Sequence, residues 1–316
     1  MKLFNQIEFC KKLCAYSPRQ GVNALESSRY IQSVLQEYSI EYIIKTHKIK
    51  TPIKWDAVLT ADGVKIPCLG SCMVSGEVEN KYSLISSLIS SQQNINLPNI
   101  NFNPECDEIS LSNFYFAPAV AISKHNVQKI IDATKVQAKV DVKIYEGDCD
   151  TILVGNILNP KNIIFSHYDC IETGATDNAS GISTMLASIV DDRSILETSL
   201  FIFDGNEEVS YDYPIYWGSG YRNFEKYNFE ILRNAEKIIV VDSVGNGINE
   251  ITQEKKLLSL AFPLASSNEL ADKIYGIFGE YHTLMKVYQA KNDTVEVLSN
   301  ESLGDAREKL LYLLSK

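Results

Sequence analysis

A chain of 316 residues, 45% hydrophobic and 22% charged, has the composition of an ordinary globular protein that can bury a full core. Its formal net charge of −10 disfavours binding to nucleic acid or to an anionic membrane, and no basic run reverses that charge locally. No stretch approaches the roughly 20 apolar residues of a membrane-spanning helix, and the start MKLFNQIEFCKKLC is too polar for a secretory signal. We therefore expect a cytoplasmic protein whose seven cysteines, an odd number without zinc-ribbon spacing, are free thiols.

The pattern along the chain predicts two domains. Apolar residues at helical spacing indicate two helices within residues 3–38, broken near Ser17–Pro18 and Gly21. Over residues 43–139, short β-like runs alternate with segments rich in Gly, Pro and Asn, and one amphipathic segment, HNVQKIIDA, interrupts them. We predict a small β-rich domain over 43–139, inserted into a larger domain formed by 1–42 and 140–316. An inserted domain often carries subunit contacts, so a homo-oligomer is one open outcome.

Strand-like and helix-like segments alternate beyond residue 150, which predicts a layered α/β fold around a mostly parallel sheet. In such sheets, ligands bind at the carboxyl ends of the strands. The predicted strands are TILVGNI (151–157), NIIFSH (162–167), SLFIFDG (199–205), EKIIVVDSV (236–244) and TLMKVYQ (283–289), and the predicted helices lie near 179–191, 218–227, 267–280 and 301–315.

Polar residues follow four of these predicted strands. Helix capping by Asp177 or Asn178 would explain one carboxylate at most. Clustered carboxylates repel one another and raise each other's pKa unless a cation lies among them, so the convergence favours a metal site over a solvated acidic turn. The residues at the strand ends are His167 and Asp169, Glu207 and Glu208, Asp242, and Gln289.

The residue types suit zinc. Imidazole nitrogen and carboxylate oxygen are zinc ligands, and Asp169, two residues after His167, is placed to hold the other nitrogen of that ring. Neighbouring residues that leave a strand point in different directions, so one carboxylate of Glu207–Glu208 can coordinate while the other acts as a general base.

Four sequence blocks, NIIFSHYD…GATDNASG, FIFDGNEEVS…WGSGY, IIVVDSVG and YQAKNDTVEVL, resemble in order and spacing the zinc aminopeptidases of peptidase family M28. The resemblance covers roughly residues 150–300 and implies a three-layer α/β/α, phosphorylase/hydrolase-like fold with a mixed, mostly parallel sheet. Within the predicted insert, PAVAIS followed by HNVQKIIDA is similar to the protease-associated domain that many such enzymes carry.

The resemblance also implies a role for each site residue. Asp177 would bridge two zinc ions, His167 and Asp242 would complete the first site, and Glu208 would bind the second. Glu207 matches the position of the general base, which takes a proton from the attacking water and passes it to the leaving amine.

Asp169 matches the carboxylate behind the histidine ligand. The implied activity is the removal of N-terminal residues from short peptides.

The chain departs from the family pattern at Gln289, where a histidine ligand is expected four residues before Asp293–Thr294. An amide oxygen is a weaker zinc ligand than imidazole, so the expected cofactor is one or two zinc ions. Three explanations stay open: His282 substitutes, a single metal suffices, or the site has decayed.

Two other functions stay open as well: a silent module that binds peptides or a partner, and a single-zinc acyltransferase of the glutaminyl cyclase type. The latter enzymes keep the missing histidine, which counts against that assignment. Tyr288, next to Gln289, either polarises the substrate carbonyl or packs beside the last strand.

Overall fold

The computed structural model describes residues 4–79, 81–89, 94–212 and 215–316. Parts of the first predicted helical segment, of the predicted insert and of the segment after Glu208 therefore lie outside the described residues. The chain forms two compact units. Two of the four boundaries between them fall inside the long strands β1 (Ile43–Ala61) and β8 (Val136–Gly155), and the other two follow Leu284 and Asn292. The first unit comprises Met1–Ile49, Gly147–Leu284 and Asp293–Lys316, and the second comprises Lys50–Glu146 and Met285–Asn292.

A mixed sheet forms the centre of the first unit, with the strand order β12-β13-β11-β9-β10-β8-β1. Strand β9 pairs in parallel with β10 and with β11, and β11 pairs in parallel with β13. Strands β8 and β12 are antiparallel to their neighbours β10 and β13. The other strands of this sheet are β9 (Asn162–His167), β10 (Ser199–Asp204), β11 (Lys237–Asp242), β12 (Asn249–Thr252) and β13 (Ile274–Gly279).

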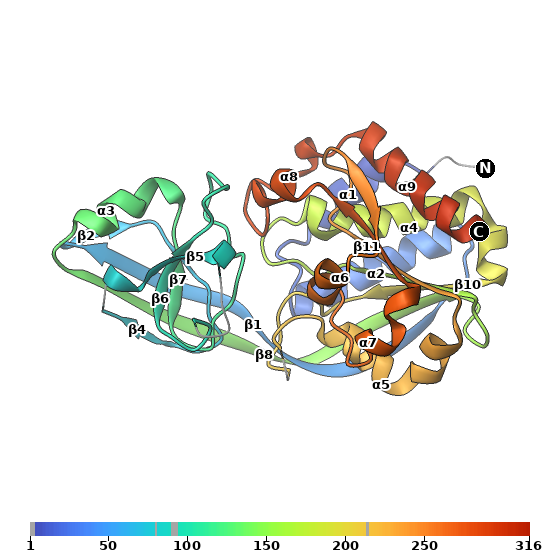
Figure 1. The fold of residues 1–316 in the computed structure, drawn as a ribbon, viewed down its shortest axis with the longest axis horizontal. Coiled ribbons are helices and arrows are strands. Elements are labelled where there is room, and N and C mark those ends of the chain that lie inside the picture. Colours follow the sequence, from blue (N-terminus) through green and yellow to red (C-terminus); the bar gives the residue numbers. More distant parts are fainter. Residues whose placement is uncertain (1–3, 80, 90–93, 213–214) are drawn as a thin grey trace. The chain divides into compact units, whose positions relative to one another are not determined.

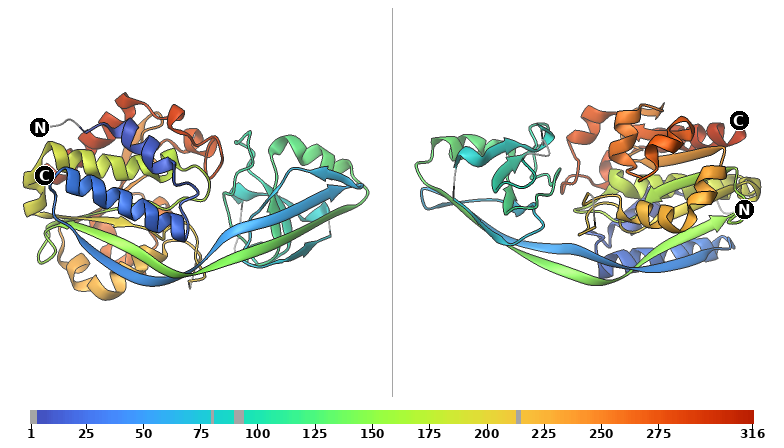
Figure 2. Two further views of the ribbon diagram at one scale, coloured as in Figure 1. Left: turned by 180° about the vertical axis from the view of Figure 1, so that it is seen from behind. Right: turned by 60° about the horizontal axis from the view of Figure 1, so that its bottom comes forward.

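Helices cover both faces of this sheet (Figures 1 and 2). Because successive side chains of a strand point to opposite faces, Ile164, Phe201 and Val241 pack into one core and Ile163, Ile202 and Val240 into the other. The first core also contains side chains of α1 (Gln6–Cys14), α2 (Val22–Glu37), α4 (Ser180–Asp191) and α9 (Asn300–Ser315). The second contains side chains of α5 (Ser219–Asn234), α6 (Lys255–Ala261) and α7 (Ser267–Leu270). The predicted three-layer α/β/α fold with a mixed sheet is confirmed.

The prediction for residues 267–289 is wrong. The helix expected at 267–280 ends after the single turn of α7, and Ile274–Gly279 forms strand β13 beside β11. The strand expected at 283–289 is replaced by helix α8 (Tyr281–Met285) and a turn. Two glycines weaken a helix at 274–279, and its apolar side chains Ile274 and Ile277 are buried in opposite cores, as a strand requires.

The second unit is built mainly of strands. A four-stranded sheet has the order β3-β7-β6-β5, while β2 pairs with β1 and β4 pairs with β8. Its likeness to a protease-associated domain, and the boundaries 43–139, stay predictions. The elements are β2 (Val64–Ile66), β3 (Leu69–Gly70), β4 (Gly76–Val78), β5 (Leu84–Ser86), β6 (Asn99–Phe102), β7 (Ala119–Ala121) and α3 (Val127–Asp132).

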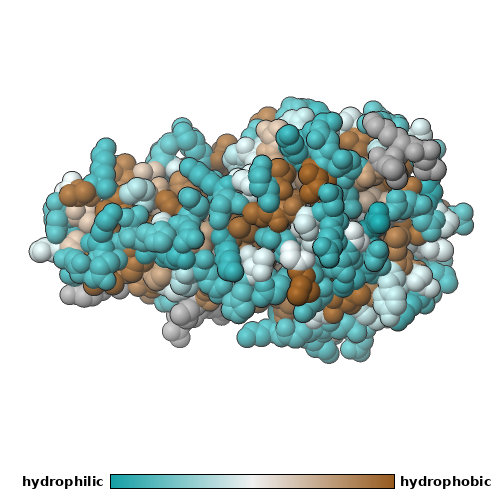
Figure 3. All heavy atoms as spheres, turned by 90° about the horizontal axis from the view of Figure 1, so that it is seen from above, coloured by the Kyte–Doolittle hydropathy of each residue, from teal (hydrophilic) through white to brown (hydrophobic). Residues whose placement is uncertain are grey.

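The surface is rich in charged groups, and Figure 3 shows hydrophilic side chains over much of one face. Within the described ranges, no helix combines the length and the apolarity that crossing a bilayer requires. All seven cysteines are free thiols.

Candidate metal centre

Three parallel strands of the first unit end at one edge of the sheet with ionisable residues. His167 is the last residue of β9, Asp204 of β10 and Asp242 of β11. His167 and Asp204 are direct neighbours in the register of the two strands. The fourth predicted strand end, at Gln289, does not exist, because no strand ends there.

The imidazole of His167 faces two carboxylates. Its Nε2 atom lies 3.2 Å from Oδ1 of Asp177 and 3.5 Å from Oδ1 of Asp242. Ligand atoms bound to one tetrahedral zinc ion at ordinary bond lengths lie about 3.3 Å from one another. Each of the two carboxylates therefore lies at about the distance from the imidazole nitrogen that ligands of one zinc ion have from each other.

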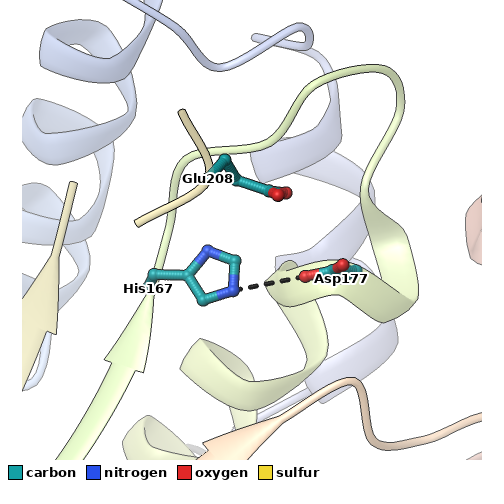
Figure 4. A group of neighbouring side chains, drawn as sticks. All are labelled: His167, Asp177 and Glu208. Carbon is teal, nitrogen blue, oxygen red and sulfur yellow. Dashed lines mark ion pairs between the residues drawn. The ribbon is translucent and has the colours of Figure 1, made fainter. Parts of the chain in front are cut away.

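Glu208 extends this group. His167, Asp177 and Glu208 each offer a ligand atom, these atoms lie within 4.8 Å of one another, and all three residues are buried. Figure 4 shows the imidazole and the Asp177 carboxylate facing each other, with Glu208 reaching in from a separate segment. Across the described parts of the chain, this is the one group of three or more His, Cys, Asp or Glu side chains with such spacing.

Asp169 organises the site from behind. One of its oxygens, Oδ1, lies 3.3 Å from Nδ1 of His167, and the residue is fully buried. The same carboxylate accepts the backbone N–H groups of Glu207 and Glu208, each at 3.0 Å. When Nδ1 donates to Asp169, the lone pair on Nε2 is free to bind a metal.

Burial and mutual repulsion shift the protonation of this cluster. Burial raises the pKa of Glu207 well above its ordinary value, and burial together with the Asp177 charge does the same for Glu208. Burial lowers the pKa of His167, but Tyr221 and the carboxylates of the site raise it well above the ordinary value. A divalent cation would relieve this repulsion, since it favours the charged carboxylates and the neutral imidazole.

The segment that carries Asp177 is held by two side chains whose roles the sequence did not reveal. The carboxylate of Asp293 accepts the N–H groups of Thr176 at 2.8 Å and Asp177 at 3.1 Å. Asn178 accepts the N–H of Gly181 in the first turn of α4 and donates to the carbonyl oxygen of Val241 on β11. The N-cap position of α4 itself is Ala179, so neither Asp177 nor Asn178 is the N-cap residue, although Asn178 bonds to the first turn of the helix.

The Ser219–Tyr221 segment supports the loop of Glu207 rather than standing apart from the site. Gly220 donates its N–H to the carbonyl of Asn206, and Gly218 donates to the carbonyl of Glu207. A Cβ atom on Gly220 would lie 1.9 Å from a carboxylate oxygen of Asp204, so only glycine fits there.

Tyr288 and Gln289 belong to the second unit. Gln289 has a left-handed backbone (φ 47°), its amide Nε2 lies 3.4 Å from the Tyr288 hydroxyl, and its carbonyl accepts the N–H of Leu111. Their predicted roles in catalysis and metal binding stay predictions. His282 lies exposed on α8 and is not part of the group around His167.

No protein-family model matches the sequence, and neither does any curated protein. Solved structures do match. BSAP, a zinc aminopeptidase from Bacillus subtilis, is similar with a TM-score of 0.69 over 96% of this chain and 92% of that chain, at 16% sequence identity. A peptidase M28 precursor from Shewanella amazonensis has a TM-score of 0.61 over 98% and 91% of the two chains, at 12% identity. The chain has the fold of the zinc aminopeptidases.

A second kind of enzyme shares this zinc aminopeptidase fold. The glutaminyl cyclase of Porphyromonas gingivalis is similar with a TM-score of 0.55 over 100% of this chain and 99% of that chain, at 11% identity. The fold alone therefore does not choose between hydrolysis and cyclisation.

The donor set fits a zinc ion. Imidazole and carboxylate are its ordinary ligands, two carboxylates flank Nε2 of His167 at distances near those between ligands of one zinc ion, and a bound cation would relieve the repulsion among the buried carboxylates.

Proposed function

We propose that the protein is a zinc-dependent exopeptidase that removes N-terminal residues from short peptides. The observation that carries the proposal is the geometry around His167, whose Nε2 faces Asp177 and Asp242 at zinc-ligand spacing. The fold shared with zinc aminopeptidases supports it.

His167, Asp177 and Asp242 would hold one zinc ion. Asp177 and Glu208 would hold a second, for which Gln289 is the proposed remaining ligand. Bound zinc would lower the pKa of a water molecule towards neutrality and polarise the peptide carbonyl.

Glu207 is the proposed general base. Its backbone is fixed on both sides, because its N–H donates to Asp169 and its carbonyl accepts from Gly218. A zinc ion beside it would favour its charged form, which can take a proton from the attacking water and pass it to the leaving amine. Tyr288 is proposed to polarise the substrate carbonyl.

Selectivity for the chain end would follow from charge. The acidic side chains around His167 attract the protonated α-amino group of a peptide, and a neutral internal peptide bond offers no such partner. The predicted peptide partner is therefore short, with a free N-terminus.

The second candidate is a zinc-dependent glutaminyl cyclase. The observation that favours it is the similarity to the Porphyromonas gingivalis enzyme over nearly the whole length of both chains.

The test uses zinc-loaded protein with a panel of aminoacyl p-nitroanilides, and a peptide with N-terminal glutamine whose cyclisation is followed as ammonia release. We expect p-nitroaniline release, and a fall of ~10²–10⁴-fold in kcat/KM for Glu207→Gln with zinc content unchanged. Ammonia release without hydrolysis would favour the cyclase. An inert protein that binds zinc would favour the silent peptide-binding module.

A variant at Gln289 tests the second metal position. If Gln289 is a ligand, Gln289→His should tighten the second zinc ion by ~10-fold or more, because imidazole binds zinc better than an amide oxygen does. The measurement is zinc stoichiometry at limiting free zinc. An unchanged stoichiometry would remove Gln289 from the site.

A further inference from the structure

The loop between His167 and Asp177 is held by an arginine from the N-terminal part of the chain. Arg19 is fully buried in the first unit. Its guanidinium donates to three carbonyl oxygens of that loop: Nε to Tyr168, Nη1 to Thr173 at 3.1 Å and Nη2 to Gly174 at 2.8 Å. The backbone between two proposed zinc ligands is thus gathered around one side chain.

The backbone of Arg19 and the side chains of its neighbours make further hydrogen bonds to the same loop. Its own N–H donates to Sγ of Cys170 at 3.4 Å. Ser17 Oγ accepts from Nη1 at 2.9 Å and donates to the carbonyl of Thr173 at 2.6 Å. Gln20, the next residue, donates from Nε2 to Oδ2 of Asp169 at 3.3 Å. Arg19 and Gln20 therefore both contact the segment between His167 and Asp177.

Arg19 carries a positive charge in a fully buried position. Among the described residues no carboxylate pairs directly with Arg19, so its guanidinium bonds mainly to backbone carbonyls, while the more distant charges of Asp169 and Asp293 favour its charged form. Burial of a cation without an ion-pair partner is costly. A lysine would supply the charge but not the planar fork that reaches three carbonyls at once.

We propose that Arg19 and Gln20 are positioning residues of the zinc site: Arg19 fixes the 168–174 loop and with it the distance from His167 to Asp177, and Gln20 orients Asp169. The inference rests on the proposed zinc site. It predicts that both residues set metal affinity without touching the metal.

The experiment measures zinc affinity, by competition with a chromogenic chelator, for wild-type protein, Arg19→Lys and Gln20→Leu. Loss of a partner behind a metal ligand weakens metal binding by ~10–100-fold, and we expect that loss in both variants. Arg193→Lys is the matched control, because Arg193 also donates to two backbone carbonyls, those of Tyr38 and Ser39, outside the metal loop. Its zinc affinity should equal that of the wild type.

Two further measurements separate positioning from a purely structural role. Circular dichroism and thermal unfolding of the zinc-free variants establish that they are folded. The visible spectrum of cobalt-saturated protein reports ligand geometry, and we expect it to change in Arg19→Lys and to stay the same in Arg193→Lys. Should Arg19→Lys fail to fold, Gln20→Leu decides the question, since it removes hydrogen bonds of a neutral amide and no buried charge.

The outcomes are distinguishable. Folded Arg19→Lys and Gln20→Leu variants with wild-type zinc affinity and cobalt spectrum would overturn the inference and leave the proposed function standing. A wild-type protein that binds neither metal would overturn both.

Discussion

The strand ends of the first unit and strand β6 of the second unit bury polar side chains of different kinds. At the strand ends of the first unit, His167, Asp169 and Asp204 are almost completely buried, and all three are ionisable. In the second unit, β6 and the residue after it bury Asn99, Asn101 and Asn103, which are neutral at every pH.

The side-chain N–H groups of Asn101 and Asn103 find acceptors within the second unit, whereas Oδ1 of Asn101 has no partner among the described residues. Asn101 donates to Ser71 Oγ at 2.8 Å and to Asn99 Oδ1 at 3.0 Å, and Asn103 donates to the carbonyl of Met285 at 2.9 Å. Amides can both donate and accept, so such a network specifies the fold without an outside partner. Carboxylates only accept, and at equal burial they repel one another. We therefore interpret the asparagines of the second unit as a structural network and the carboxylates around His167 as a site for a cation.

The largest expected effect comes from removing one carboxylate of the charged group. Asp177→Asn should weaken zinc binding by more than the ~10–100-fold that follows loss of an outer partner, because a proposed ligand is lost. Burial and the charge of Asp242 raise the pKa of Asp177, so the neutral amide should also stabilise the zinc-free protein, by ~0.5–2 kcal/mol. Zinc titration and thermal unfolding measure the two effects.

The control for this variant is Asp272→Asn, since Asp272 is exposed in the same unit and outside the site. Its zinc affinity and stability should match the wild type. Tight zinc binding by Asp177→Asn would show that the carboxylate is not a ligand.

Removing an amide from the asparagine group of the second unit should lower the free energy of unfolding and leave zinc binding unchanged. Asn101→Ala leaves partners of the buried amide unsatisfied, which costs ~1–3 kcal/mol in the free energy of unfolding. Denaturant unfolding and metal analysis should show this loss with unchanged zinc content. A loss of zinc, with the half-buried Asn126→Ala as an unaffected control, would contradict this separation.

The raised pKa values of two buried carboxyl groups predict how the stability of the zinc-free protein depends on pH. Burial, followed by the charge of Asp169, raises the pKa of Asp204 to about 7, and burial raises the pKa of Asp293 to about 6. The folded state then holds protons that the unfolded state releases near pH 4, so each group contributes stability that is complete below that pH and is lost as the pH rises towards 6 to 7.

The melting temperature of zinc-free protein should therefore fall between about pH 4 and pH 7, by a few degrees. Zinc binding releases the protons, so the rise in melting temperature on zinc addition should grow over the same range. Calorimetry at several pH values measures both trends. A zinc effect that is independent of pH would show that the metal binds elsewhere.

Much of the metal centre was predictable because the three central strands are simple in sequence. Apolar runs such as Ile163–Phe165 are followed at once by polar residues, and parallel strands bring their carboxyl ends to one edge. The fourth strand was misplaced because residues 274–279 and 283–289 are both apolar and rich in strand-forming residues. Local pattern could not choose between them.

Other features depend on contacts between distant parts of the chain. Asp293 accepts the backbone N–H of a residue 116 positions away, and Arg19 reaches carbonyls about 150 positions away. The sequence does not indicate such backbone partners, since every residue has a carbonyl group and almost every residue has an N–H group. Only the folded structure shows which of them a buried side chain meets.

The most direct measurement is the zinc content of purified protein, before and after incubation with zinc, alongside Asp177→Asn. We predict at least one tightly held zinc ion per wild-type chain and its loss in the variant. A folded wild-type chain that holds no zinc after incubation would contradict the claim that His167 and its carboxylates are gathered around a metal.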